Sequence, residues 1–471
     1  MKVPESSPAA PRVYTIPPSA PFLTTLARAI LAGNLPSPGG AAPDPLTLPF
    51  TTIYLPTRRA ARALRDAFLT EAKRDALLLP RIRTLGDPDE EAAIIFETED
   101  NPDDDGALGA PAIAALPRRL ALMRLVLAFA KQLRAGATAE RGVAAPPLVD
   151  VTPGQASYLA ADLANLMDDW EREEIDLSKL EEIVPEEFAG HWQLTVDFLK
   201  IVTEHWPEYL KDNGLASPIA RRNALMAREA ARLAVGSPYP VIAAGSTGTV
   251  PATARLLEVI ASLPNGAVVL PGLDKTLDDK SWEMLAEHPE HPQAGMAELL
   301  HKIGLSRAAV DDVPGSTPDG PARARLDLAS ETMRPADSTE HWQTFLSGEA
   351  STEARTRLGA ALDGIRLVEA PTAHDEAEAI ALILRSAIET QGKTAALITP
   401  DRVLARRVAA RLRRYDLSID DSAGVPAART VPGAFLDLVL GAIETDFAPP
   451  ELMALLKHPL SRLGRHPAEA R

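Results

Sequence analysis

The chain has 471 residues, of which 46% are hydrophobic and 24% charged, a composition typical of soluble globular proteins that form several cores. Lys and Arg number 49 against 65 Asp and Glu, so the net charge is −16 and the surface as a whole repels phosphate. The absence of Cys excludes disulfides, thiolate metal sites, iron–sulfur ligation and cysteine nucleophiles within this sequence. Any nucleic acid must therefore bind at a local basic surface.

Neither a secretory signal nor a membrane span is predicted. Residues 1–12 have no apolar core and are expected to form a flexible tail. The most apolar stretch, Leu120–Ala130, is interrupted by Arg124 and is shorter than the roughly 20 residues that cross a bilayer. We therefore expect a cytoplasmic protein that has no membrane partner.

Residues 13–110 predict the first part of an α/β domain. Val13–Ile16 is typical of a strand, and an apolar helical pattern begins at Phe22. Thr51–Pro56 predicts a second strand, after which Thr57 is a helix cap. The segment Asp87–Asp105 has ten carboxylates and no Lys or Arg, which indicates a solvated acidic loop.

Residues 111–234 predict a helical insertion, because Leu163, Leu166, Met167 and Trp170 recur at helical spacing. A second helical pattern includes the apolar residues Trp192, Val196, Leu199, Val202 and Trp206. Trp residues in such patterns belong to a core more often than to a base-stacking platform.

Residues 235–312 return to alternating strands and helices, with strands at Pro240–Ala244 and Ala267–Leu270 and a helix at Val250–Leu263. This alternation predicts the second part of one parallel, doubly wound α/β domain.

Residues 313–362 are expected to form a linker and a surface loop, because 313–340 are rich in Pro, Asp, Ser and Gly. Residues 363–471 predict a second α/β unit. Its expected strands are Ile365–Glu369 and Thr394–Thr399, and its expected helices are Asp375–Ile388, Val403–Arg414, Val431–Ile443 and Leu452–Leu463.

No residues suited to catalysis or nucleotide binding stand out. The loop after the first strand contains Pro17, Pro18 and Pro21, which have no N–H groups for phosphate, and it has no Lys. Gly392-Lys393-Thr394 resembles the end of a phosphate loop but precedes a predicted strand instead of following one. His288 and His291 lack a third ligand at metal spacing, so we expect no catalytic residue and no metal site.

Two kinds of anion site are suggested. The turn Gly245, Ser246, Thr247 and Gly248 follows a strand and opens a helix, so it is either an anion-binding turn or a simple connection. Two helices carry Arg residues on one face, where either solvent or a phosphate backbone would meet them. The DNA-binding candidates from these two helices are Arg58, Arg59, Arg62, Arg402 and Arg406.

Eight segments, taken together and in order, resemble the AddB subunits of bacterial AddAB helicase–nucleases, in their alphaproteobacterial form. The segments are Val13–Pro18 with Pro21–Leu23, Tyr54–Arg59, Leu79–Asp87, Ala243–Thr253, Leu270–Asp274, Ile398–Arg402, Asp420–Gly424 and Leu455–Leu460. Each segment alone is weakly specific, but the resemblance spans residues 13–464.

The resemblance implies two RecA-like domains of superfamily 1 helicase type that have lost the ATP-motor residues. It also implies an AddA-type motor subunit as partner, double-stranded DNA ends and single-stranded DNA as substrates, and a role in double-strand break repair by homologous recombination. In the family a C-terminal nuclease holds an iron–sulfur cluster and uses Mg. With no Cys here, we expect a fragment that lacks that nuclease and carries no cofactor.

Two other functions stay open from the sequence. The chain could be a stand-alone α/β enzyme or binding protein for a phosphorylated small molecule, held by the Gly245–Thr249 turn. It could also be an interaction scaffold with neither ligand.

Overall fold

The computed structural model describes residues 10–37, 42–74, 76–85, 110–139, 151–176, 198–343, 351–462 and 464. The chain forms two compact units, unit 1 (Met1–Asp363) and unit 2 (Gly364–Arg471). The expected acidic loop at Asp87–Asp105 and residues 1–9 of the expected tail lie outside the described residues. Arg12, the last residue of that tail, already belongs to the body of unit 1, since its N–H donates to the Ala261 carbonyl at 2.9 Å.

Unit 1 is built on a six-stranded parallel sheet in the order β3-β2-β4-β5-β1-β6. Its strands are β1 (Val13–Ile16), β2 (Thr52–Leu55), β3 (Arg81–Thr84), β4 (Val241–Ala244), β5 (Gly266–Pro271) and β6 (Asp311–Asp312). The α/β prediction and the strands β1, β2, β4 and β5 are confirmed. The two edge strands were not predicted, because β3 alternates Arg with Ile and Thr and β6 is only two residues long.

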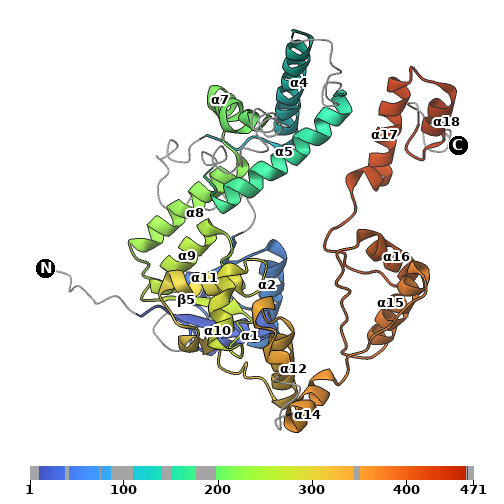
Figure 1. Ribbon diagram of the computed structural model, residues 1–471. Coiled ribbons are helices and arrows are strands. Elements are labelled where there is room, and N and C mark those ends of the chain that lie inside the picture. Colours follow the sequence, from blue (N-terminus) through green and yellow to red (C-terminus); the bar gives the residue numbers. More distant parts are fainter. Residues whose placement is uncertain are drawn as a thin grey trace. The chain divides into compact units, whose positions relative to one another are not determined.

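Helices cover both faces of this sheet (Figure 1). On one face, α1 (Phe22–Leu31) and α2 (Arg58–Ala72) pack their apolar residues against Ile53 and Leu55 of β2. On the other face, α8 (Pro218–Ala234), α9 (Pro251–Ser262) and α11 (Ala294–Ile303) form a second core with Tyr54 and Val268. Burial on both faces is the usual environment of a parallel sheet and explains its apolar strands.

A helical block is inserted between β3 and β4, as predicted. It contains α4 (Ala115–Ala139), α5 (Pro153–Glu173), a π-helix (Ile201–His205), α7 (Trp206–Asp212) and α8. Leu122, Leu163, Met167 and Trp206 are buried in its core. Trp192 and Val196, which the pattern also placed here, lie outside the described residues. No helix in the described ranges is long and apolar enough to cross a membrane.

The segment expected as a linker and surface loop differs from that prediction. It contains α12 (Gly320–Thr332) and α14 (Ser351–Leu362), which pack against each other. Asp319 caps α12 by accepting a hydrogen bond from the Ala322 N–H at 2.9 Å, and Pro321 lies in the first turn. The Pro, Gly and Asp content that suggested a loop is therefore partly a helix start signal.

Unit 2 contains α15 (Ala373–Ile388), α16 (Arg402–Arg413), α17 (Val431–Glu444) and α18 (Pro449–Lys457). These four helices were predicted, although the last ends at Lys457 and not at Leu463. The expected strands Ile365–Glu369 and Thr394–Thr399 are not strands, and Leu367 and Ile398 are 86% and 93% exposed. An apolar segment becomes a parallel strand only beside other strands, and the described part of unit 2 offers none.

Candidate functional site

The carboxyl ends of the parallel strands form one edge of the sheet, and two adjacent strand pairs there are topological switch points. β2 leads into α2 on one face, whereas its neighbour β4 leads into α9 on the opposite face. The neighbouring strands β1 and β5 behave in the same way, because the chain leads from β1 to α1 on one face and from β5 toward α11 on the opposite face. Ligands of open α/β sheets bind in such crevices, so these two places are the candidate sites.

At the β2/β4 crevice the structure brings together two of the predicted features. The register that pairs Tyr54 with Ala243 sets the Pro56–Arg58 segment beside the turn that begins at Gly245. A Cβ atom on Gly245 would lie 3.4 Å from Cε1 of Phe22 and 3.6 Å from Cδ of Pro56. These are ordinary van der Waals distances, so it is the positive φ of 78° at Gly245 that favours glycine.

The N–H groups of the Gly245–Gly248 turn are partly used within the protein. Gly245 N–H donates to the Val269 carbonyl at 3.0 Å, and Gly248 N–H donates to Oγ of Ser246 at 3.3 Å. Gly248 is buried, and a Cβ there would lie 2.9 Å from Cδ2 of Leu299 in α11. The geometry of the turn thus serves the packing of β4 and α11, and Ser246 and Thr247 provide the half-exposed polar part.

The first set of predicted Arg residues begins at the same crevice. Thr57 caps α2, since its Oγ1 accepts a hydrogen bond from Ala60 N–H at 3.1 Å, and Arg58 is the first helical residue. The side chains of Arg58, Arg59 and Arg62 are exposed, opposite the buried residues Ala61, Leu64, Ala67 and Phe68. Arg58 and Arg59 also make polar contacts inside the protein. With the neighbouring exposed Arg65, these residues form what we term the α2 basic face.

The second set lies in unit 2, on α16, so the structure does not bring the two sets together in one unit. Arg402 donates two hydrogen bonds to the carboxylate of Asp421, at 3.1 and 3.0 Å, and this pairing raises the pKa of Arg402. Arg406 is exposed, while Leu404, Val408 and Leu412 are buried. Arg402 therefore has an anionic partner already, and Arg406 is the better placed of the two for a phosphate.

The second crevice, between β5 and β1, is largely filled by the chain itself. Pro18 packs so closely on Gly272 that a Cβ at Gly272 would lie 2.9 Å from Cγ of Pro18. The unfilled part of the crevice is a cavity of about 140 Å³. Leu326 of α12 and Met333, which directly follows α12, are among the residues that line it. Cavities that hold drug-sized ligands are larger, about 300 Å³ or more.

Asp274 and Gln293 maintain the shape of this filled crevice and were not recognised as important from the sequence. The carboxylate of Asp274 accepts hydrogen bonds from the N–H groups of Thr276 and Leu277, at 2.8 and 3.0 Å. Gln293 bridges Gly272 and Asp274 through its side-chain amide, at 3.0 Å each. Burial alone would raise the pKa of Asp274, but the hydrogen bonds that its carboxylate accepts outweigh burial and lower it. The carboxylate therefore serves as the acceptor that shapes its own loop.

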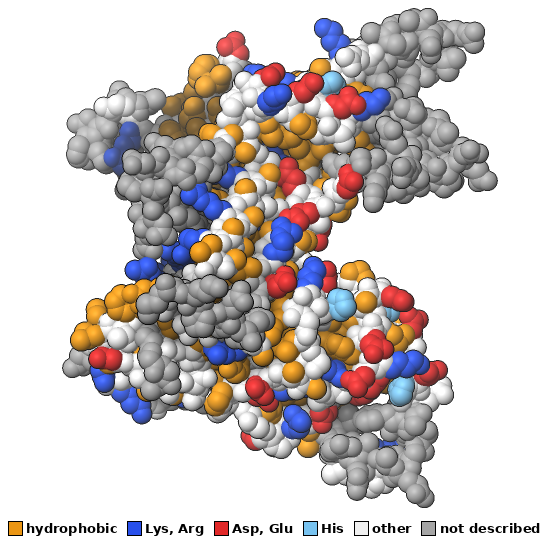
Figure 2. All heavy atoms as spheres, turned by 90° about the vertical axis from the view of Figure 1, so that its left-hand side faces the viewer, with side chains coloured by type: hydrophobic (Ala, Val, Ile, Leu, Met, Phe, Trp, Pro, Cys, Tyr) orange, Lys and Arg blue, Asp and Glu red, His pale blue; other side chains and the backbone are white. Residues whose placement is uncertain are grey.

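Basic and acidic side chains are mixed on the face that Figure 2 displays, with Lys and Arg scattered among Asp and Glu. In the described ranges no group of three or more His, Asp or Glu side chains is arranged to hold a metal ion.

Comparison with known proteins does not assign the chain to a family. No protein-family model matches the sequence, and no curated protein sequence matches it.

Proposed function

We propose that this chain is the helicase-like, non-motor part of a DNA-end-processing helicase–nuclease complex of AddAB type, with a motor subunit as its partner. The observation that carries the proposal is the α2 basic face, which starts at the carboxyl edge of a parallel sheet consistent with a Rossmann or RecA-like fold. Guanidinium groups in that position suit a phosphate backbone.

The placement of the eight AddB-like segments supports the same proposal. Five of these segments include the carboxyl end of a strand. The five are Val13–Pro18 with Pro21–Leu23, Tyr54–Arg59, Leu79–Asp87, Ala243–Thr253 and Leu270–Asp274. Segments that are far apart in the sequence thus meet at the edge where α/β proteins bind ligands. A resemblance produced by composition alone would have no reason to concentrate there.

The filled β5/β1 crevice supports the non-motor part of the proposal. A nucleotide triphosphate at the loop after β1 would need backbone N–H donors and space, whereas Pro17 and Pro18 lack donors and Pro18 contacts Gly272. Movement along DNA would then be driven by the partner subunit, and not by ATP hydrolysis in this chain.

The finer part of the proposal is that unit 2 represents a second RecA-like layer. Its support is the order of the segments, since Ile365–Glu369 precedes α15 and Thr394–Thr399 precedes α16. Neither segment is in a strand, so both would become strands only when flanking strands are supplied. Amide hydrogen exchange tests this, with strong protection of both segments expected in the assembled complex and none in the chain alone. Rapid exchange in both states would refute it.

The experiment for DNA binding is a salt titration with a single-stranded oligonucleotide. Arg62→Ala should weaken the dependence of log affinity on log salt by about one unit, because one phosphate contact is lost. The matched control is Lys302→Ala, which removes an exposed cation that pairs with Glu298 on α11. A slope unchanged by Arg62→Ala, or changed equally by both variants, would remove the α2 basic face from the DNA interface.

The small-molecule alternative is tested in the same preparation by thermal unfolding with nucleotides, sugar phosphates or inorganic phosphate. A ligand that binds only the native state raises the melting temperature. Stabilisation by a small phosphate without any binding of DNA would favour the alternative, with Ser246 and Thr247 as its polar groups.

A further inference from the structure

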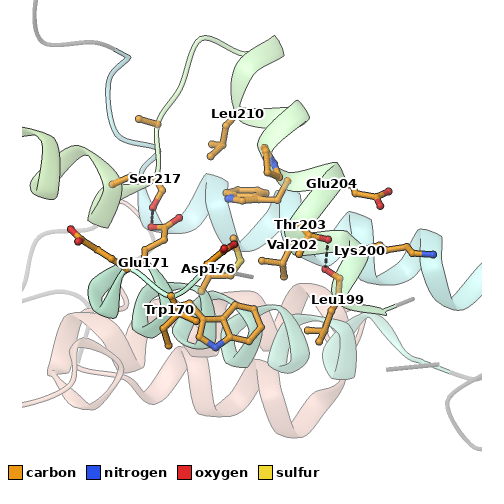
Figure 3. A pocket seen from close by; sticks show the side chains of 17 residues that line it. Trp170, Glu171, Asp176, Leu199, Lys200, Val202, Thr203, Glu204, Leu210 and Ser217 are labelled. Carbon is orange, nitrogen blue, oxygen red and sulfur yellow. Dashed lines mark hydrogen bonds between the residues drawn. The ribbon is translucent and has the colours of Figure 1, made fainter. Parts of the chain in front are cut away.

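The helical block of unit 1 contains a cavity of about 830 Å³ that the proposed DNA function does not use. It is formed by the end of α5, the π-helix with the residues just before it, α7 and the start of α8 (Figure 3). Its apolar wall includes Met167, Trp170, Val202 and Leu210. A cavity of this size is in the range that holds a bound ligand or anchoring side chains.

The rim of this cavity is acidic. Its described lining includes one cation, Lys200, and four carboxylates, those of Glu171, Glu174, Asp176 and Glu204 (Figure 3). Of these carboxylates, Glu174 already pairs with Arg255 at 2.5 Å. Asp176 and Glu204 are exposed, and Asp176 also takes part in an interaction within the chain. Phosphate is repelled at such a rim, which argues against nucleic acid as the occupant.

Glu171 is held in place at the inner edge of the rim. Its carboxylate accepts a hydrogen bond from the hydroxyl of the buried Ser217, and its backbone carbonyl accepts one from Nδ2 of Asn223 at 3.0 Å. Burial raises the pKa of Glu171 despite the hydrogen bond with Ser217. A cation beside this carboxylate would favour its ionised form.

One wall of the cavity is formed by a π-helix, an irregular type of helix. The π-helix Ile201–His205 directly precedes α7, and three of its residues, Val202, Thr203 and Glu204, line the cavity. Single π-turns inside α-helices are rare and occur frequently at functional sites. Here the π-turn places one apolar and one acidic side chain on the same wall.

We propose that this cavity is a docking site for a partner polypeptide that inserts an apolar side chain flanked by Lys or Arg. The apolar side chain would pack on Val202 and Leu210, and the flanking cation would lie between the carboxylate rim and the indole of Trp170. Charge complementarity and cation–π attraction both favour that occupant. The proposal is independent of DNA binding by the α2 basic face.

A peptide titration of the full chain tests the proposal. The probe is a synthetic ten-residue peptide with central Leu and Phe residues and flanking Arg residues, and the signal is the fluorescence of Trp170. Saturable quenching or a spectral shift is expected. Because Trp206 also lines the cavity, Trp170→Phe should reduce this signal and not abolish it. Glu204→Lys should weaken binding about tenfold, because one carboxylate of the rim is replaced by a cation. Glu340→Lys, an equal charge change at an exposed residue away from the cavity, should leave binding unchanged.

Three outcomes would overturn this docking site. The first is no fluorescence change with the Arg peptide in a chain that unfolds at the normal temperature. The second is equal binding of a peptide in which Glu replaces every Arg. The third is a Trp170-dependent signal with a single-stranded oligonucleotide, which would make the occupant a nucleic acid. Because none of these readouts involves Arg62 or Arg406, failure here is distinguishable from failure of the proposed DNA function.

Discussion

Glu229 is a buried carboxylate that joins the helical block to the sheet. It is 5% exposed on α8, accepts a hydrogen bond from the hydroxyl of Tyr54 in β2, and pairs with Arg232 at 2.8 Å and Arg83 of β3 at 3.5 Å. Burial would raise its pKa, but its hydrogen-bonding partners outweigh burial and lower it. The stability that it contributes is therefore present above the unfolded pKa of 4.5 and is lost as the pH falls through the lower folded pKa.

Removing this carboxylate deprives Arg83, Arg232 and the Tyr54 hydroxyl of the buried partner that they share. We expect Glu229→Ala to lower the free energy of unfolding by about 3–5 kcal/mol, as for other broken buried ion pairs. Tyr54→Phe removes one hydrogen bond and should cost about 1 kcal/mol. Urea unfolding at neutral pH measures both changes. A loss below about 1 kcal/mol for Glu229→Ala would show that the partners re-pair with water or with each other.

His288 contributes to stability with a pH dependence opposite to that of Glu229. Its two ring nitrogens lie 3.0 Å from a carboxylate oxygen of Glu290 and 3.1 Å from one of Asp337. These hydrogen bonds raise the pKa of His288 above 6.5. The contribution to stability is thus fully present below pH 6.5 and is lost as the pH rises through the folded pKa. The difference in melting temperature between wild type and His288→Gln should be largest in mild acid and should shrink above neutrality. A difference that grows with pH would contradict the assignment.

At the scale of elements, Gly295 shows how a helix can be fixed by what it contacts. It lies in the first turn of α11, and a Cβ there would lie only 2.3 Å from Cγ2 of Thr249 in the turn after β4. Gly295→Ala should therefore destabilise by about 1–3 kcal/mol through overpacking, although Ala favours helices. Gly359→Ala in α14, where nothing lies within 4 Å, should be neutral or stabilising. Adding Thr249→Ser, which removes Cγ2, should restore stability to Gly295→Ala. Equal effects of the two Gly substitutions would exclude this contact.

The elements also show how far the sequence determines the fold. β2 and β4 were predictable because each is a short apolar run that ends before a helix cap or a Gly turn. Ile365–Glu369 has the same local pattern and yet is not a strand, because pairing depends on residues elsewhere in the chain or in a partner. The Pro, Asp, Ser and Gly content around α12 favours a loop, whereas Asp319 and Pro321 form a local helix start signal, and the helix follows that signal.

The candidate site was predictable only in part, for a related physical reason. Strand ends and Arg spacing are local features, so the α2 basic face could be recognised from Thr57 and the residues that follow it. Arg402 pairs with Asp421, which lies 19 residues later in the sequence, and no local sequence pattern predicts this pair. The cavity beside Trp170 likewise depends on where α5, the π-helix, α7 and α8 meet, and the spacing of its apolar residues is that of an ordinary helix core.

For the whole molecule, the net charge of −16 means that DNA would meet local basic faces on an acidic body. The two Arg sets belong to different compact units, so their contributions to DNA binding should be independent. Between about 50 and 200 mM salt, Arg62→Ala and Arg406→Ala should each reduce the slope by about one unit, and the double variant by about two. Arg385→Ala on α15, whose guanidinium pairs with Glu389, is the control within unit 2.

If Arg406→Ala behaves like Arg385→Ala while Arg62→Ala reduces the slope, DNA contacts belong to unit 1 and the α16 face is solvated. If the double variant loses no more than either single one, the two Arg residues compete for the same phosphate, which independent faces do not allow.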